Sequence, residues 1–293
     1  MKKQLLAASA IAGLMLGAAI AQGADSKGAG IVGSVHDMNT VGSIYSVGDP
    51  GKRICAFCHS PHHSTQDNNQ LSADVANLGV LGVTAKYKIY APLWSRTGMD
   101  TMPAPTPYLS QTFNPQTDAK PYDPLIGPSR LCLTCHDGTI AIDNYYGNTA
   151  TTGGTTGDAF NGPLGGGDQL SIGMGGGLMG LSNDHPIGMQ YNTYQADARY
   201  ELRADTTPFQ TTAGAPSAKM IKSVLYTDPS DTNMNGTKGV VTCASCHDVH
   251  NGKDVGNKAP LGNMRGFLLY GSQVNSSFCL TCHDKNPTVP AGN

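Results

Sequence analysis

The cysteines of this 293-residue chain follow one pattern four times. All eight occur as pairs with two residues between them, and a histidine directly follows each second cysteine. The four patterns are Cys55, Cys58 and His59; Cys132, Cys135 and His136; Cys243, Cys246 and His247; and Cys279, Cys282 and His283. Cysteines three places apart lie on one face of a helical turn, so both thiols can reach one flat group. This is the attachment pattern of c-type haem, in which the histidine is the proximal ligand of the iron.

Other uses of paired cysteines fit this pattern less well. An exported chain with an even number of cysteines can be a disulfide scaffold, and cysteine pairs can bind structural zinc. Neither use needs a histidine after every second cysteine. A thioredoxin-like redox motif needs one such pair in a βαβ unit rather than four. We therefore expect four covalently bound haems.

The first 23 residues have the pattern of an export signal. Lys2 and Lys3 give a basic start, residues 5–20 form an apolar run, and Ala-Ile-Ala at 19–21 supplies a small-residue cleavage pattern. The run is too short for a membrane span, which needs about 20 apolar residues. We expect residues 1–23 to be removed and the mature chain to lie outside the cytoplasm.

The composition leaves little material for an ordinary packed core. The chain has 37 Gly and 18 Pro, and only 6% of its residues are aromatic. Charged residues make up 14%, against about 25% in typical domains, whereas disordered chains are usually rich in charge. We predict a mostly coil fold with short helices at the haem sites, little strand, and a core built from four stacked haems. The net charge of −2 points to neither nucleic acid nor an anionic membrane as a partner.

The supply of histidine nearly matches the need for a second ligand at each iron. Nine histidines are present, of which four belong to the cysteine patterns. The expected distal ligands are His36, His62, His185 and His250, and His63 is left over or exchanges roles with His62. Methionine is the usual alternative and raises the reduction potential. The methionine candidates are Met38, Met189 and Met264.

The two halves of the chain repeat one order of features. Each half has an upstream histidine, a cysteine pattern with another histidine three places on, and a second cysteine pattern. We expect a dihaem module at 24–146, a Gly- and Thr-rich loop at 147–182, a second dihaem module at 183–284 and a flexible tail at 285–293. His62 and His250 lie on the same side of their own porphyrin as the proximal histidine, so each should serve a neighbouring haem.

Weaker signals concern single residues and two short segments. Arg53 and Arg130 each precede a haem cysteine by two places, where they could pair with propionates or be solvated surface charges. Residues 85–94 have the pattern of a short strand. Residues 231–242 copy the first half of a calcium loop, but Thr242 stands where the loop needs Glu, so calcium there is a minor alternative.

Four strings in the chain resemble one family. They are ICAFCHSPH at 54–62, PLWSR at 92–96, LCLTCHDGT at 131–139 and NDHPIG at 183–188. From about His36 to Asp284, the chain is similar to the extracellular multihaem c-type cytochromes of metal-reducing bacteria, and among these to the OmcE-type tetrahaem nanowire cytochromes. The resemblance implies two-histidine haems in a continuous chain. It also implies a head-to-tail homopolymer in which the adjacent protomer donates one sixth ligand.

These features predict an electron carrier rather than an enzyme, at an extracellular or outer-surface location. Its expected partners are other redox proteins and extracellular electron acceptors. A monomeric periplasmic electron shuttle would have the same haem residues and stays open as an alternative. A multihaem reductase or a haem gas sensor needs an open iron position, whereas spare histidines can fill every sixth site here.

Overall fold

The structure is a computed structural model. It describes residues 31–32, 34, 36–39, 49–62, 93–95, 108, 110, 113, 123–136, 145, 181, 184–210, 216–227, 239–250, 268–271 and 273–285. Several expectations fall outside these residues: the export signal, the 147–182 loop apart from Leu181, residues 85–92 of the expected strand, residues 231–238 of the calcium-like segment, His63, Met264 and residues 286–293.

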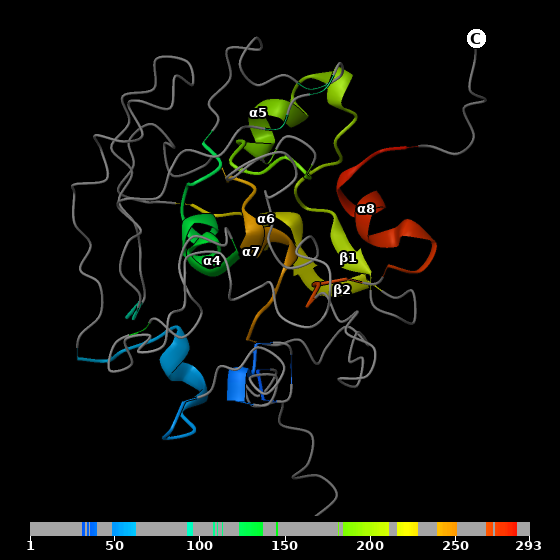
Figure 1. The fold of residues 1–293 in the computed structure, drawn as a ribbon. Coiled ribbons are helices and arrows are strands. Elements are labelled where there is room, and N and C mark those ends of the chain that lie inside the picture. Colours follow the sequence, from blue (N-terminus) through cyan, green and yellow to red (C-terminus); the bar gives the residue numbers. More distant parts are fainter. Residues whose placement is uncertain are drawn as a thin grey trace, which may run out of the picture.

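Each of the four cysteine patterns lies on a helical turn (Figure 1). The turns are η1 (Ile54–Phe57), α4 (Pro128–His136), α7 (Cys243–Cys246) and α8 (Ser277–Cys282), the last preceded by η5 (Val274–Ser276). At three of the patterns the histidine N–H donates to the carbonyl of the first cysteine, at 2.8 Å for His59, 3.1 Å for His247 and 3.0 Å for His283. These bonds close the turn, so each of these histidines stands at the end of the turn that carries its two cysteines.

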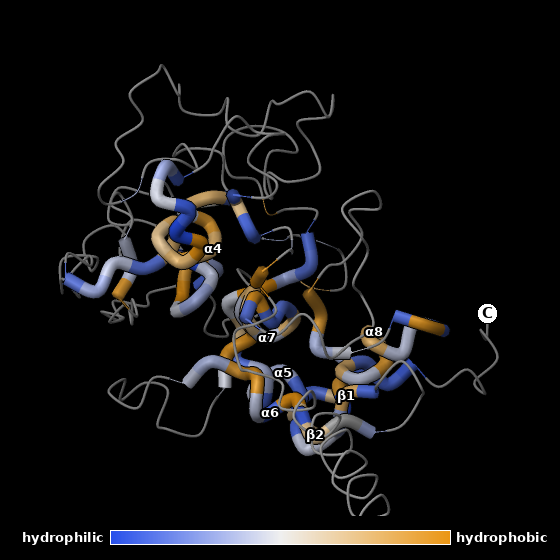
Figure 2. The backbone as a smooth tube through the Cα atoms, turned by 90° about the horizontal axis from the view of Figure 1, so that it is seen from below, coloured by the Kyte–Doolittle hydropathy of each residue, from blue (hydrophilic) through white to orange (hydrophobic). Residues whose placement is uncertain are grey.

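The other elements are short and lie in the second half of the chain. They are α5 (Tyr191–Gln195), η4 (Ala198–Tyr200), β1 (Pro208–Gln210), β2 (Pro216–Met220) and α6 (Ile221–Val224). β1 and β2 pair antiparallel, with Pro208 opposite Met220 and Gln210 opposite Pro216, and the register is irregular between these pairs. In both views α8 lies beside this pair of strands (Figures 1 and 2).

A backbone crossing at Gly188 joins the two halves. The Asp123 N–H donates to the Gly188 carbonyl at 2.9 Å, and the Gly188 N–H donates to the Val241 carbonyl at 2.6 Å. Gly188 has φ +87°, and a Cβ there would lie 2.1 Å from the Asp123 carbonyl oxygen. Only glycine therefore fits this position. The crossing fixes the start of α4 relative to the segment that leads into α7.

Apolar side chains within the described residues are buried in several small clusters. The largest contains Phe113, Met189, Tyr191, Tyr194, Ile221 and Val241. Separate clusters consist of Leu125 with Leu133, Phe57 with Tyr145, and Ile126 with Val240. In Figure 2 the hydrophobic stretches are correspondingly short and alternate with hydrophilic ones. Domains usually have one contiguous core, so the protein part of this fold has an apolar core that is divided into small clusters.

Candidate metal centres

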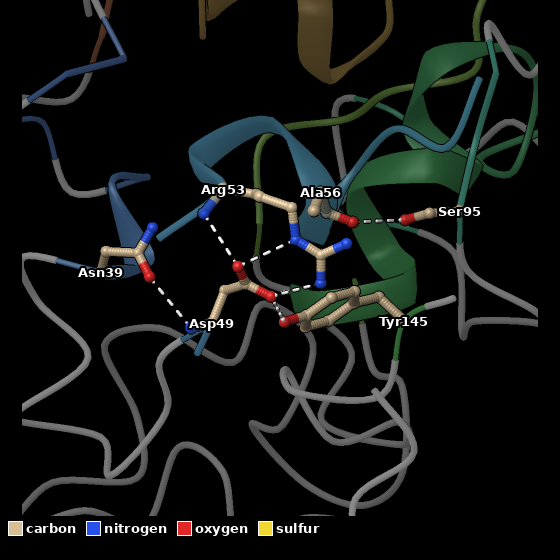
Figure 3. Close-up of polar contacts among 6 residues, drawn as sticks. All are labelled: Asn39, Asp49, Arg53, Ala56, Ser95 and Tyr145. Carbon is tan, nitrogen blue, oxygen red and sulfur yellow. Dashed lines mark hydrogen bonds and ion pairs between the residues drawn. The ribbon is translucent and has the colours of Figure 1, made fainter. Parts of the chain in front are cut away.

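Asp49 holds the turn of the first motif in place. Its carboxylate accepts three hydrogen bonds from Arg53: from the backbone N–H at 2.8 Å, from Nε at 3.0 Å and from a terminal guanidinium nitrogen at 2.6 Å (Figure 3). The Tyr145 hydroxyl donates to the same carboxylate at 2.6 Å. The Asp49 N–H donates in turn to Asn39 Oδ1 at 2.9 Å. Hydrogen bonds from Arg53 are the main cause that lowers the pKa of Asp49 below its usual range.

Of the two arginines expected near propionates or solvent, neither is a simple surface charge. The Arg53 guanidinium binds Asp49, although its side chain is 56% exposed. Arg130 is only 3% exposed, so the expectation of a solvated surface charge is wrong there. Burial raises the pKa of Asp123, and the charge of Arg130 partly offsets this effect. Arg130 is buried because its side chain lies on the same buried face of α4 as Leu133 and Thr134.

Residues 93–95 form hydrogen bonds with the backbone of the first motif. The Ser60 N–H donates to the Leu93 carbonyl at 2.7 Å, and the Ser95 N–H donates to the Cys58 carbonyl at 2.9 Å. The Ser95 hydroxyl also donates to the Ala56 carbonyl at 3.0 Å (Figure 3). These bonds place Trp94 opposite His59 as an antiparallel bridge.

The second and third motifs lie against each other. Helices α4 and α7 are side by side in both views, and the Cys243 N–H donates to the Ser129 hydroxyl at 3.1 Å. The Cys132 thiol donates a hydrogen bond to the Cys243 sulfur, which raises the pKa of Cys132 and lowers that of Cys243. Two flat groups attached at these cysteines would meet near this contact.

The fourth motif is held by the segment around α5 and η4. The Arg203 N–H donates to the Cys282 carbonyl at 2.9 Å, and the Asp284 N–H donates to the Glu201 carbonyl at 2.6 Å. The Tyr191 hydroxyl donates to the Arg203 carbonyl at 2.9 Å and lies 3.3 Å from the Cys282 carbonyl. These bonds fix the end of α8, where the motif histidine follows.

Histidine side chains from distant parts of the chain meet in pairs. His59 faces His250 with 6.2 Å between ring centroids and 26° between ring planes. His36 and His136 lie 6.0 Å apart at 75°, and His185 and His283 lie 6.1 Å apart at 67°. Each pair joins one histidine of a cysteine motif to one of the four histidines expected as distal ligands.

The spacing of these pairs matches two imidazoles that share one metal ion. A histidine nitrogen binds a metal at about 2 Å, and its ring centre lies about 1 Å beyond that nitrogen, so two ligands on opposite sides have centres about 6 Å apart. Within the described residues there is no group of three or more His, Cys, Asp or Glu side chains that could hold a bare metal ion. Two protein ligands are what an iron needs when a porphyrin fills its other four positions.

The His36 ring is suited to a ligand role by its surroundings. Burial is the largest cause that lowers its pKa to about 4. The positive charges of His136, His247 and His250 lower it further. The neutral form that results is the one that binds metals. Its Nδ1 atom is buried and has no hydrogen-bond partner in the protein.

The fourth expected distal ligand, His62, is placed differently. Its side chain is exposed and makes no hydrogen bond, ion pair or ring contact in the part of the chain that the structure describes.

Two methionine alternatives are engaged in packing. Met189 is buried in the largest apolar cluster, and Met38 packs beside Phe57.

Sequence reasoning gave all the histidines of these pairs but missed two residues at the first motif. Asp49 and Trp94 have no motif of their own, and their roles depend on segments that are distant in the sequence. The available signals are that Trp94 is the only tryptophan in the chain and that it lies in the PLWSR string at 92–96.

No protein family, curated protein or solved structure matches the chain. None of the described helices is long and apolar enough to cross a membrane.

Proposed function

We propose that the protein is a tetrahaem c-type cytochrome that carries electrons and is not an enzyme. The observation that carries this proposal is the spacing of 6.0 to 6.2 Å in three histidine pairs. Each pair has one member next to a cysteine motif, so the thiols and the first axial ligand come from one helical turn. When bound, haem supplies the one-electron couple between ferric and ferrous iron.

The pairs also suggest which histidine serves which motif. His250 completes the first motif through His59, His36 completes the second through His136, and His185 completes the fourth through His283. The first pairing crosses between the halves of the chain. At the three motifs that have a histidine pair, two imidazoles at one iron would leave no open position for a substrate, which favours electron transfer over reduction of a bound molecule there.

The contacts between motifs favour one continuous electron path. The Cys132 thiol contacts Cys243, which joins the second motif to the third. Burial is the main cause that raises the pKa of Cys246 to about 12, and the nearby Cys282 and Cys279 raise it further. The fourth motif therefore lies near the third. His250 of the first pair also lowers the pKa of His36 of the second pair. These contacts bring the third motif close to the second and the fourth, and the pairing of His250 with His59 brings it close to the first as well.

The proposal includes a location and an assembly. The expected export signal favours an extracellular or outer-surface role between other redox proteins and extracellular acceptors, with a periplasmic shuttle as the alternative. The exposed His62 is available to an iron of a neighbouring protomer. Such a head-to-tail contact does not close on itself and generates a filament.

A pyridine haemochrome assay on the purified native protein tests the cofactor, and four haems per chain are expected. Electron paramagnetic resonance should then give only low-spin ferric signals. A high-spin signal in the resting protein would contradict full ligation and favour the reductase. Absence of haem would remove the whole proposal.

Negative-stain electron microscopy tests the assembly separately. Filaments are expected from the wild type and short particles from His62→Ala, with four haems in both. If the wild type is a monomer with four low-spin haems, the proposed electron carrier stands and the proposed filament is wrong.

A further inference from the structure

Residues 93–95 form a clamp on the proximal ligand of the first motif. Three hydrogen bonds hold this clamp to the turn: Ser60 N–H to the Leu93 carbonyl, Ser95 N–H to the Cys58 carbonyl and Ser95 hydroxyl to the Ala56 carbonyl. Leu93 has φ +54° and is half exposed. A leucine rarely adopts this left-handed conformation. The surrounding bonds must therefore hold the backbone there, and the next residue, Trp94, is turned inward.

The Trp94 indole lies directly against the His59 imidazole. Their ring centroids are 5.8 Å apart and their planes meet at 89°, an edge-to-face arrangement that aromatic rings prefer. Trp94 is 9% exposed, and its Nε1 atom is buried without a hydrogen-bond partner. A buried indole N–H almost always has an acceptor, so this N–H points to a group that the protein itself does not provide.

The chemistry of a haem at this motif leaves one class of acceptor. A histidine that binds iron through Nε2 keeps a proton on Nδ1, so His59 cannot accept from the indole. The porphyrin nitrogens are occupied by the iron, and thioether sulfurs accept only weakly. The porphyrin carboxylates remain, and they are strong acceptors.

We propose that Trp94 is a positioning residue that fixes the plane of the His59 imidazole and donates its Nε1–H to a porphyrin carboxylate at the first motif. This inference rests on the proposed haem at Cys55 and Cys58. A hydrogen bond to the carboxylate favours its charged form and lowers its pKa. It also partly neutralises negative charge near the iron, which keeps the potential of this haem higher than it would be without the donor.

Trp94→Phe tests the hydrogen bond because it keeps an aromatic ring beside His59 and removes the N–H. Redox titration over a range of pH should show that one of the four potentials falls and that the pH dependence of that potential moves to higher pH. Trp94→Tyr, whose hydroxyl can donate, should restore part of both shifts. Ser223→Ala is the control, because it removes a hydroxyl hydrogen bond to the Met220 carbonyl outside the clamp and keeps the indole N–H. It should leave the pH dependence in place.

A measurement on the wild type keeps the inference testable if the variants do not mature. Because the chain has one tryptophan, ultraviolet resonance Raman bands of indole report on Trp94 alone. A hydrogen-bonded N–H is expected in the haem-loaded protein, and a free N–H would overturn the inference. If the protein binds four haems and Trp94→Phe changes none of their potentials, the inference about Trp94 is wrong but the proposed cytochrome function stands. A wild type without haem would instead remove the proposed function.

Discussion

The imidazoles of His59 and His250 face each other at 6.2 Å although they belong to opposite halves of the chain. His250 follows the third motif by only three residues. Its ring nevertheless pairs with the histidine of the first motif. The second half of the chain therefore contributes one ring of a pair whose other ring lies in the first half.

His250→Met should change the haem at the first motif rather than the haem beside it in the sequence. A methionine in place of one histidine raises the reduction potential, so redox titration should find one of four potentials raised. Repeating the titration in a Cys55→Ser and Cys58→Ser background, which lacks the first haem, should remove the raised potential. Persistence of the raised potential in that background would assign His250 to another iron.

Asp49→Asn should destabilise the protein by about 1 to 2 kcal/mol, because the buried Tyr145 hydroxyl loses a charged acceptor. The pKa of Asp49 lies below its ordinary value of 3.8, so its carboxylate stabilises the fold above that pH. This contribution is lost as the pH falls toward the lowered pKa. Melting temperatures from circular dichroism should fall on acidification below pH about 4, and less steeply in Asp49→Asn than in the wild type.

Asp197→Asn is the matched control for this carboxylate. Asp197 also pairs with a nearby arginine, Arg199, at 2.7 Å, but the Asp197 side chain is 26% exposed, whereas that of Asp49 is fully buried. Exposed pairs contribute little to stability, so the control should lose less stability than Asp49→Asn. Equal losses in the two variants would contradict a special role for Asp49.

Gly188→Ala should be strongly destabilising, by at least about 2 kcal/mol. The new methyl group would meet the Asp123 carbonyl at 2.1 Å, and φ is +87°. Gly271→Ala is a milder comparison, because its methyl group would lie 3.2 Å from the rings of Phe209 and Phe278. Thermal melts of both variants give the order, and a Gly188→Ala protein as stable as Gly271→Ala would show that the crossing can move.

A chain with all eight cysteines replaced by serine should be largely unfolded. The apolar clusters among the described residues are small and separate, so little core remains without the porphyrins. Circular dichroism should show no cooperative melt, and emission from Trp94 should be that of an exposed indole. A cooperative transition would mean that the protein core suffices alone.

A helical turn at each cysteine pair could be predicted from the sequence, because the spacing of two thiols needs one turn and no distant contact. The six histidines that meet in pairs were also singled out by number and position. Their pairing could not be predicted, because His59 and His250 are distant in the sequence and meet only through tertiary packing. Asp49 and Trp94 were missed for the same physical reason: their partners, Tyr145 and His59, are brought to them by tertiary packing.

The pairing of His59 with His250 also has a consequence in time. A chain made and exported from its N-terminus delivers Cys55 and His59 long before His250 emerges. If iron is held as proposed, the first motif would have its cysteines and His59 in place while its second ligand, His250, is still absent. The time for which this site stays incomplete would then be set by the speed at which the second half of the chain arrives.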